Sequence, residues 1–323
     1  MKWLVTGGAG FIGGHVVHAL LRRGYDAVVL DDFSTGRAEV VPEGVPLIQG
    51  TLLDSGVIRR ALEQPGLTGV IHIAGYKFAG ESVGLPLHTY EQNVVGMMNL
   101  LDEMQNAGLS RIIFSSSAAV YGDVDVDVIR EDHPTKPANP YGESKLIGEW
   151  LLHNMGVAHG MQHSSLRYFN VVGSRQPGIF DTSPYSLFSL VFDAISKGVA
   201  PKILGSDYAT HDGTCVRDYI PVGLLADAHV VAAERLANGD PLEPAYNIGT
   251  GTGHSVAEVM KVMAKVTGID FEAERVPRRP GDPATVVASG ELARRDLGWS
   301  PETDLTQMVE SAWQAYRTHS RTD

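Results

Sequence analysis

The sequence contains very little cysteine: one residue, Cys215, among 323. A single thiol cannot form an intrachain disulfide, so the composition gives no sign of an oxidising compartment. Long apolar runs are missing too, because none reaches the roughly 18 residues typical of a transmembrane helix. The apolar run at residues 3–5 meets glycine almost at once, which indicates a buried strand and not the core of a signal peptide. We therefore expect cytoplasmic residence and no membrane partner.

Positive charge is also scarce in this chain. Lys and Arg total 26 against 38 Asp and Glu, and the formal net charge is -12. A basic patch for nucleic acid or anionic lipid is therefore not expected, and a phosphorylated ligand would depend on a few local arginines. The 12 histidines show no metal-ligand spacing, so we predict no metal site and no nucleic-acid partner.

The first half of the chain alternates short β-branched runs with amphipathic stretches. Such alternation of strands and helices is typical of an α/β fold with a Rossmann-type, doubly wound parallel sheet. The predicted strands are residues 2–6, 26–32, 45–50, 69–75 and 111–117, and the clearest predicted helices are residues 11–23 and 90–105.

The pattern loosens after about residue 170, where prolines and glycines cluster before a predicted helix at about 185–197. We expect a smaller C-terminal lobe here, made of residues 171–217 and 249–323. The apolar stretch at 218–236 predicts a strand and a helix that return to the main sheet, so the first domain takes residues 1–170 and about 218–248. The tail after 250 predicts two more helices and an arginine-rich loop at 275–282.

A glycine motif, GGAGFIG, occupies residues 7–13, between the first strand and the first helix. Gly7 would allow the tight turn, Gly10 the approach of a pyrophosphate to the helix N-terminus, and Gly13 close packing of helix on strand. Three glycines also suit any tight loop, so the context decides. Asp31 ends the second strand, where a carboxylate would bind the ribose 2′-hydroxyl of a dinucleotide. Because that carboxylate would repel a 2′-phosphate, and Arg37 lies six residues on, the pattern predicts NAD over NADP.

A tyrosine and a lysine lie four residues apart in the segment YGESK, residues 141–145. On a helix this spacing places Tyr141 and Lys145 on one face, and Pro140 suits the helix start. The lysine charge would favour the phenolate, so Tyr141 is the predicted acid and base. The pair follows a serine cluster at 115–117, at the carboxyl end of the fifth strand, where open α/β sheets carry their active sites.

Several motifs together resemble known proteins. The chain is similar to extended short-chain dehydrogenases in the glycine motif, SSSAAVYG (115–122), YGESK (141–145) and LRYFN (166–170). More narrowly, it resembles the UDP-glucose/UDP-galactose 4-epimerase family in AGYKFAGESV (74–83), GTCVRDYIPV (213–222), YNIGTGTGHSV (246–256) and RRPGD (278–282). The similarity runs through almost the whole chain with matching order and spacing.

The resemblance implies an isomerase that inverts C4 of a UDP-sugar. In this scheme Ser117 hydrogen-bonds the 4-hydroxyl, Tyr141 removes its proton, and C4 gives a hydride to NAD, while Lys145 tunes the tyrosine. The 4-keto sugar then turns and takes the hydride back on its other face. The resemblance also suggests a homodimer that pairs helices at about 90–105 and 141–155.

The same resemblance implies two sets of binding residues. The residues expected to bind NAD are Gly7, Gly10, Phe11, Ile12, Gly13, Asp31, Asp32, Ser34, Thr35, Gly36, Thr51, Leu52, Ile73, Ala74, Gly75, Lys77, Asn93, Ser115, Tyr141, Lys145, Tyr168 and Phe169. The residues expected to bind the UDP-sugar are Lys77, Ser117, Tyr141, Asn170, Ser186, Arg217, Arg279, Asp282 and Val286.

Departures from the family pattern leave the substrate open. Thr51 replaces an aspartate expected at the adenine, Ser186 an asparagine expected at the diphosphate, and Pro221 a residue that is usually polar. Ala118 and Ala119 replace the acidic residues of the related 4,6-dehydratases, which argues against elimination of water. The open alternatives are N-acetylhexosamine, UDP-uronate, UDP-pentose or secondary-metabolite sugars, a dehydrogenase or reductase that releases NADH, and an NAD-sensing protein that is not an enzyme.

Overall fold

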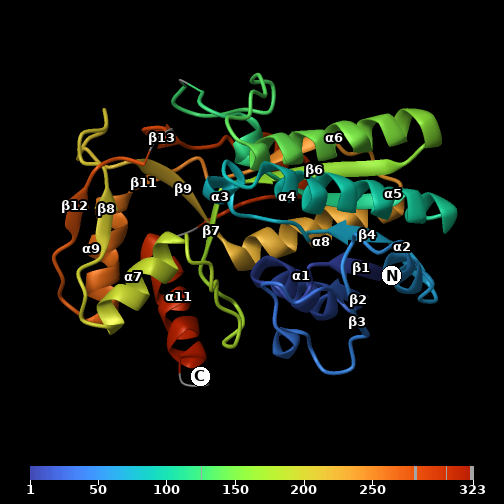
Figure 1. Ribbon diagram of the computed structural model, residues 1–323, viewed down its shortest axis with the longest axis horizontal. Coiled ribbons are helices and arrows are strands. Elements are labelled where there is room, and N and C mark those ends of the chain that lie inside the picture. Colours follow the sequence, from blue (N-terminus) through green and yellow to red (C-terminus); the bar gives the residue numbers. More distant parts are fainter. Residues whose placement is uncertain (125, 280–281, 303, 321–323) are drawn as a thin grey trace. The chain divides into compact units, whose positions relative to one another are not determined.

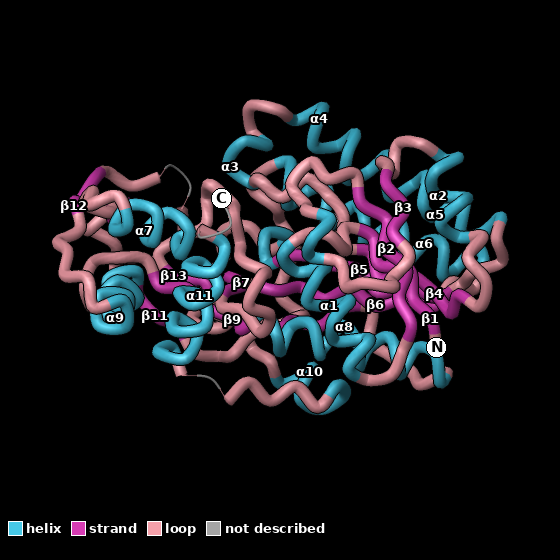
Figure 2. Tube along the Cα trace, turned by 90° about the horizontal axis from the view of Figure 1, so that it is seen from below, coloured by secondary structure: helices cyan, strands magenta, loops and turns pink. Residues whose placement is uncertain are grey.

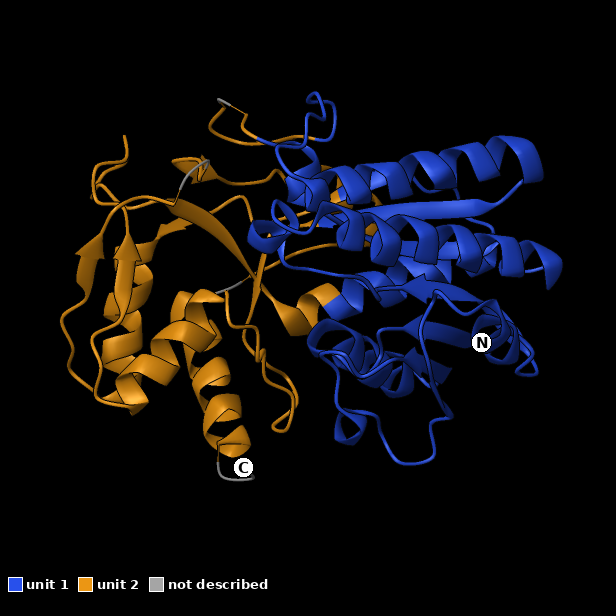
Figure 3. Ribbon diagram, in the orientation of Figure 1, with its two compact units in different colours: residues 1–122, 131–167, 226–246 blue, residues 123–130, 168–225, 247–323 orange. Residues whose placement is uncertain are grey.

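The computed structural model describes residues 1–124, 126–279, 282–302 and 304–320. These residues form two compact units (Figure 3). Unit 1 comprises residues 1–122, 131–167 and 226–246, and unit 2 comprises residues 123–130, 168–225 and 247–323.

The seven-stranded sheet of unit 1 has the strand order β10-β6-β5-β4-β1-β2-β3. Its strands are β1 (Lys2–Thr6), β2 (Asp26–Asp31), β3 (Leu47–Gln49), β4 (Leu67–His72), β5 (Arg111–Ser117), β6 (Gln162–Tyr168) and β10 (Ala245–Ile248), the last two of which end in unit 2. The pairs from β3 through β2, β1 and β4 to β5 are parallel. The strand order reverses its direction around β1, as in a doubly wound fold, so the predicted fold class is confirmed.

Helices cover both faces of this sheet (Figure 1). On one face lie α2 (Ser55–Leu62), α5 (Gly96–Asn106) and α6 (Pro140–His159), whose apolar residues share one core cluster with alternate residues of the strands. The other face carries α1 (Phe11–Arg22) and the part of α8 (Val222–Asn238) that belongs to unit 1. Because both faces are covered, the central strands contain continuous apolar runs; Trp3, Leu4 and Val5 in β1 are all fully buried.

Local signals explain where α6, the helix of the YGESK segment, begins and ends. Asn139 is its N-cap and accepts a hydrogen bond from the amide of Gly142 at 2.9 Å, and Pro140 occupies the first turn. The helix ends at Gly160, which has a φ of 70° in the left-handed region that glycine adopts without strain. The same local chemistry therefore fixes the position of Tyr141 one residue inside the helix.

Unit 2 has two small sheets, four complete helices and the first residues of α8 among its described residues. Strand β9 (Val216–Pro221) pairs with β7 (Asn170–Val172), β11 (Gly253–Ser255) and β13 (Thr285–Val286), and β8 (Lys202–Leu204) pairs with β12 (Glu274–Val276). The helices are α7 (Leu187–Ser196), α9 (Val256–Thr267), α10 (Glu291–Leu297) and α11 (Leu305–His319). Helix α11 packs against α7 and α9 around an aromatic core, seen together in Figure 2.

Four expectations about the elements differ from the structure. The helix predicted at 90–105 is three joined segments, α4 (Pro86–Tyr90), a π-helical turn η2 (Glu91–Val95) and α5. The described tail after residue 250 has three helices where two were predicted, because the seven residues of α10 are too few to show a period. Residues 123–130 belong to unit 2, and so does β9, which was expected in the main sheet. An apolar pattern identifies a strand but does not say which strand it will pair with.

Within the described part of the chain, no helix is long and apolar enough to cross a membrane. Those same residues include no group of three or more His, Cys, Asp or Glu side chains that could hold a metal ion.

Candidate active site

The glycine loop of unit 1, residues 7–13, packs so closely that side chains at Gly7 and Gly13 would clash with the backbone. Gly7 has a φ of 71°, and a Cβ there would lie 2.8 Å from the amide nitrogen of Ala74. A Cβ at Gly13 would lie 1.9 Å from the carbonyl oxygen of Gly7, so only glycine lets α1 approach the loop this closely. Gly10 caps α1 without a side-chain hydrogen bond, which leaves the first helical amides to a ligand. The loop therefore fits the pyrophosphate of a dinucleotide, as NAD would require.

Asp31 lies at the end of β2 and is 7% exposed. Its carboxylate accepts hydrogen bonds from the amides of Ala9 in the glycine loop and Phe33, both at 2.9 Å. Burial raises the pKa of Asp31, and these two bonds partly offset the effect. The carboxylate is thus fixed beside the glycine loop, at the position expected for a ribose ligand. The 2′-phosphate of NADP would be repelled by this carboxylate.

The other predicted cofactor residues lie around this loop or farther along the sheet edge. Asp32 accepts hydrogen bonds from the amide and hydroxyl of Ser34 at 2.8 and 2.7 Å. Thr51 uses its hydroxyl to accept from Leu53 at 3.2 Å, and Leu52 is buried in the core. Phe11 and Ile12 open α1, residues 34–36 follow β2, and residues 73–75 follow β4.

Asn93 lies at the centre of the π-helical turn and connects two parts of the site. Its amide accepts from the backbone nitrogen of Tyr76 at 2.7 Å and donates to the carbonyl of Tyr76 at 3.0 Å. It also donates to the hydroxyl of Ser144 in α6 at 2.9 Å. The side chain thereby joins the loop after β4, which carries Gly75 and Lys77, to the helix of the YGESK segment.

The structure brings the three predicted catalytic side chains together in unit 1. Ser117 ends β5, and the hydroxyl of Tyr141 is hydrogen-bonded to its side chain. Lys145 lies one turn farther along α6, with its ammonium 5.9 Å from the centre of the Tyr141 ring and 2.8 Å from the carbonyl oxygen of Ser115. Burial raises the pKa of Tyr141, an effect that the bond to Ser117 partly offsets. Burial also lowers the pKa of Lys145 to about 8.

Sequence reasoning missed the groups that hold these residues in place. Glu149 in α6 accepts from Arg167 in β6 through two bonds, at 2.9 and 2.6 Å, and from the hydroxyl of Ser116 at 2.6 Å. Arg167 also donates to the hydroxyl of Tyr121 at 2.8 Å. On the other side of β5, Ser115 Oγ lies 2.9 Å from His229 Nε2 in α8. The one feature of the sequence that could have indicated these groups is the position of Glu149, which lies two turns after Tyr141 on the same helix.

Unit 2 holds the predicted substrate residues Asn170 and Ser186, and also Tyr168 and Phe169, which were expected at the cofactor. Asn170 begins β7 opposite Tyr219 of β9. Ser186 is the N-cap of α7 and makes no side-chain capping bond.

The other predicted substrate residues of unit 2 lie on or near β9 and β13. Arg217 on β9 pairs with Asp282, with Nη2 and Oδ1 2.5 Å apart. Val286 on β13 lies opposite Arg217 in the parallel register and is half-buried, and Arg279 is exposed. The structure thus places Arg217 and Val286 on neighbouring strands of one small sheet, with Asp282 paired to Arg217.

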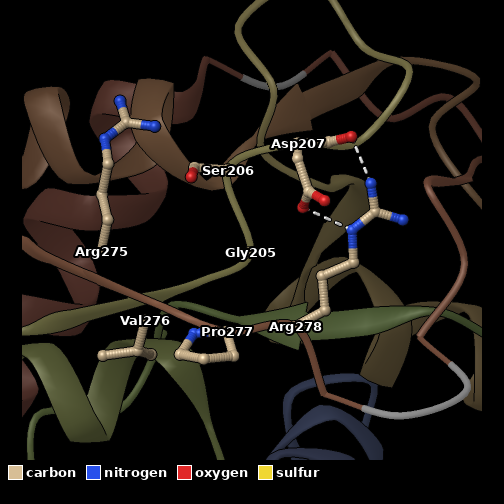
Figure 4. Close-up of a pocket in the computed structure, with 7 residues that line it drawn as sticks. All are labelled: Gly205, Ser206, Asp207, Arg275, Val276, Pro277 and Arg278. Carbon is tan, nitrogen blue, oxygen red and sulfur yellow. Dashed lines mark hydrogen bonds and ion pairs between the residues drawn. The ribbon is translucent and has the colours of Figure 1, made fainter.

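A surface pocket of about 490 Å³ in unit 2 was not predicted (Figure 4). Residues 205–207 line one side and residues 275–278 the other. Arg278 pairs with Asp207, at 2.6 Å between Nε and Oδ1, and its guanidinium lies 4.1 Å from the centre of the Tyr208 ring. The arginine-rich loop was predicted from the sequence, whereas the facing loop had no recognisable signal.

Comparisons with known proteins find similar sequences and structures over nearly the whole chain. Residues 3–249 match the model of the NAD dependent epimerase/dehydratase family. A UDP-glucose 4-epimerase of Corynebacterium glutamicum is 43% identical over 317 residues, which are 97% of this chain and 95% of that protein. A crystal structure of a UDP-glucose 4-epimerase has a TM-score of 0.94 at 37% identity and covers 99% of this chain and 98% of its own.

A second solved structure was determined with ligands. It is a UDP-glucose 4-epimerase from Bifidobacterium longum in complex with NAD+ and UDP, 34% identical to this chain, with a TM-score of 0.91 and both chains covered in full. The family match spans more than half of the chain, and the similarity to the curated relatives extends over nearly all of it. The chain therefore belongs to the NAD dependent epimerase/dehydratase family, and the resemblance seen in its motifs is confirmed.

Proposed function

We propose that this protein is an NAD-dependent UDP-sugar 4-epimerase that interconverts UDP-glucose and UDP-galactose. The observation that carries the proposal is the hydrogen-bonded pair of Ser117 and Tyr141, with the Lys145 ammonium one helical turn away, at the carboxyl end of β5. The relatives named UDP-glucose 4-epimerase support the same activity.

The glycine loop and Asp31 would hold the cofactor. The amides at the start of α1 would bind the pyrophosphate, and the fixed carboxylate of Asp31 would accept from the ribose. When bound, NAD supplies the site that accepts the hydride of C4 and returns it, together with a positive nicotinamide ring.

Tyr141 would move the proton of the sugar. It accepts the proton of the 4-hydroxyl on its phenolic oxygen while C4 is oxidised, and returns it when C4 is reduced. Ser117, hydrogen-bonded to Tyr141, would also bind the reacting oxygen and hold it close to the phenol. Because burial raises the pKa of Tyr141, the phenolate depends on nearby positive charge, of which the Lys145 ammonium is the protein's own source.

The UDP part would bind in unit 2. Arg217 is held in place by Asp282 and by the carbonyl of Val216, to which it donates at 2.8 Å, so its guanidinium is preorganised. Arginine forks suit the paired oxygens of a diphosphate. We therefore expect Arg217, with the exposed Arg279, to bind the diphosphate, whereas Asn170 and Ser186 lie on the elements beside them.

The experiment that tests the function is incubation of the purified protein with a panel of UDP-sugars, followed by proton NMR of the anomeric signals. We expect UDP-galactose to convert to an equilibrium mixture with UDP-glucose without net formation of NADH. A dehydrogenase or reductase would instead accumulate one NADH, or consume one, for each sugar transformed. Unchanged anomeric signals across the entire panel would refute the epimerase.

We also propose that the protein is a homodimer built on α5 and α6. Several large apolar side chains of these helices are exposed, among them Met98 (51%), Trp150 (57%) and Val157 (77%). Exposed apolar side chains gathered on neighbouring helices are typical of an interface. Light scattering on a sizing column should give twice the chain mass for the wild type and a smaller mass for Trp150→Glu. Leu21→Glu, on the exposed part of α1, is the control, and a monomeric wild type would contradict the proposal.

A cytoplasmic location is a proposal as well. It is supported by the lone cysteine, which leaves no intrachain disulfide that would need an oxidising compartment.

A further inference from the structure

The ammonium of Lys145 lies in an unusual place for a charge. The residue is 5% exposed, and its one hydrogen bond is to the backbone carbonyl of Ser115 at 2.8 Å. Among the residues that the structure describes, no carboxylate forms an ion pair with it. A buried ammonium without a counter-ion loses the hydration that stabilises its charge, so another group must supply part of the compensation.

The aromatic ring of Phe114 lies next to this ammonium. Lys145 Nζ is 4.9 Å from the centre of the ring, within the range of a cation–π interaction. Phe114 is 3% exposed and precedes the serine cluster in β5. The negative face of a phenyl ring attracts a cation, and the attraction is strongest where water is excluded. The contact therefore offers the compensation that a carboxylate does not.

Two neighbours fix the position of this ring. A Cβ at Gly148, one turn after Lys145 in α6, would lie 2.7 Å from a ring carbon, so the glycine lets the helix sit against the phenyl edge. The imidazole of His72 in β4 is stacked on the ring, with centres 5.6 Å apart and planes 19° apart. His72 is in turn held by Thr6, since its Nδ1 lies 2.7 Å from the threonine hydroxyl. The ring thus has little freedom to move away from the ammonium.

We propose that Phe114 is a positioning residue whose ring face stabilises the charge of Lys145 and holds the ammonium at the carbonyl of Ser115. The catalytic consequence rests on the function proposed above, because it matters only if Lys145 tunes Tyr141. The electrostatic contact itself does not depend on that function and can be measured separately.

The other titratable groups near Lys145 do not provide this stabilisation. His72 is neutral, since burial and the nearby Lys145 charge lower its pKa to about 3. Tyr141 lies on the same helix and offers a weaker contact, because its ring centre is 5.9 Å from the ammonium and burial raises the pKa of its phenol, which disfavours the phenolate that could pair with the charge. The imidazole of His229 in α8 lies 2.9 Å from the hydroxyl of Ser115 and carries no negative charge that could pair with the ammonium. Phe114 therefore remains as the main partner of the ammonium. The electron density of its ring can be altered without changing the charge of any side chain.

The test replaces Phe114 with mono-, di- and trifluorinated phenylalanine. Fluorine withdraws electron density from the ring face but hardly changes its shape, so the cation–π attraction weakens stepwise while packing is kept. The pKa of Lys145 is followed by NMR of lysines labelled with ¹³C at Cε, and its signal is assigned by its loss in Lys145→Met. We expect each added fluorine to lower the pKa of Lys145 further below about 8, by roughly one unit in total for the trifluoro ring.

A matched control separates the contact from a general effect of fluorine. Phe192 is fully buried in the aromatic core of unit 2, and its trifluoro replacement should leave the Lys145 titration unchanged. Phe114→Leu, which removes the ring face altogether, should lower the pKa of Lys145 at least as far as the trifluoro ring. The same pKa in all members of the fluorine series would overturn the proposal.

Activity gives a second, independent readout. If the protein is the proposed epimerase, the alkaline limb of the kcat/KM profile should move to lower pH across the fluorine series, in step with the NMR titration. If the pKa of Lys145 falls but no UDP-sugar reacts, the proposed function is wrong and the contact stands. If UDP-sugars react but the pKa does not move, the contact is wrong and the function stands.

Discussion

Replacing Glu149 with glutamine removes one charge from a buried ion pair without changing the shape of the side chain. Glu149 and Arg167 have side chains that are 10% and 9% exposed, and two hydrogen bonds join them. In Glu149→Gln the guanidinium stays buried but loses its counter-ion and one of its acceptors. Breaking such a pair from one side costs about 3–5 kcal/mol. The bond to Tyr121 remains, so we expect a value near the lower end, about 3 kcal/mol.

The assay is urea unfolding followed by tryptophan fluorescence, analysed with a slope common to all variants. The matched control is Glu274→Gln, which removes the charge of an ion pair with Lys202 whose side chains are 57% and 63% exposed. Exposed pairs of this kind contribute less than about 1 kcal/mol. The double variant Glu149→Leu/Arg167→Met removes both charges and should recover part of the loss, because the penalty comes from the unpaired charge.

The result that would refute this reasoning is a cost for Glu149→Gln as small as that for Glu274→Gln. It would mean that water or another group reaches the guanidinium of Arg167. A double variant as unstable as Glu149→Gln would instead show that the pair itself, and not the unpaired charge, carries the stability.

Three shorter predictions concern the site of unit 1. Tyr141→Phe should lose about 10²–10⁴ in turnover with an unchanged circular dichroism spectrum; near-normal turnover would exclude Tyr141 as the acid and base. His72 has a folded-state pKa of about 3 against 6.5 when free, so the folded protein binds fewer protons than the unfolded chain between these values. Acidification below pH 6.5 should therefore cost up to about 1.4 kcal/mol of unfolding free energy per pH unit, and equal slopes for the wild type and His72→Gln would contradict this. Titration of cofactor-free protein should give tighter binding of NAD than of NADP, and equal affinities would remove Asp31 from the ribose role.

The features that the sequence predicted well depend on residues close together in the chain. The glycine loop spans residues 7–13 and the YGESK segment residues 141–145, and each is fixed by turn chemistry or helix spacing. Each short apolar strand and each amphipathic helix is likewise recognised from neighbouring residues. Their order along the chain predicted the sheet of unit 1. The family resemblance then supplied the residues of unit 2, most of which lie on or beside short strands.

What the sequence did not reveal depends on partners far apart in the chain. Phe114 reads as one more apolar residue of a strand, and only the packing of β4 and α6 against it creates its contact with Lys145. The same holds for Arg167, whose partner Glu149 is 18 residues away in sequence. Strand β9 has a clear apolar pattern, but this pattern does not show that it pairs with β7, β11 and β13. Its partner residues lie up to about 70 positions away in the sequence, as Thr285 does from Val216.

The breadth of the substrate range should depend on the volume of Val286. In the family that the chain resembles, a bulky tyrosine at this position tends to exclude N-acetylated sugars. Val286 lies on β13 opposite Arg217, the residue proposed to bind the diphosphate, so we expect a larger side chain there to narrow the space for the sugar. Pressing an acetamido group against a large ring costs about 1–3 kcal/mol of overpacking, which corresponds to roughly 5- to 150-fold in rate.

We therefore expect the wild type to epimerise UDP-N-acetylglucosamine as well as UDP-glucose. Val286→Tyr should lose roughly 5- to 150-fold in kcat/KM for the acetylated sugar and little for UDP-glucose. Val286→Ile is the control, because it adds one methylene without a ring and should keep both activities. A wild type that converts UDP-galactose well but leaves the acetylated sugar untouched would show that something other than the size of this side chain limits the pocket.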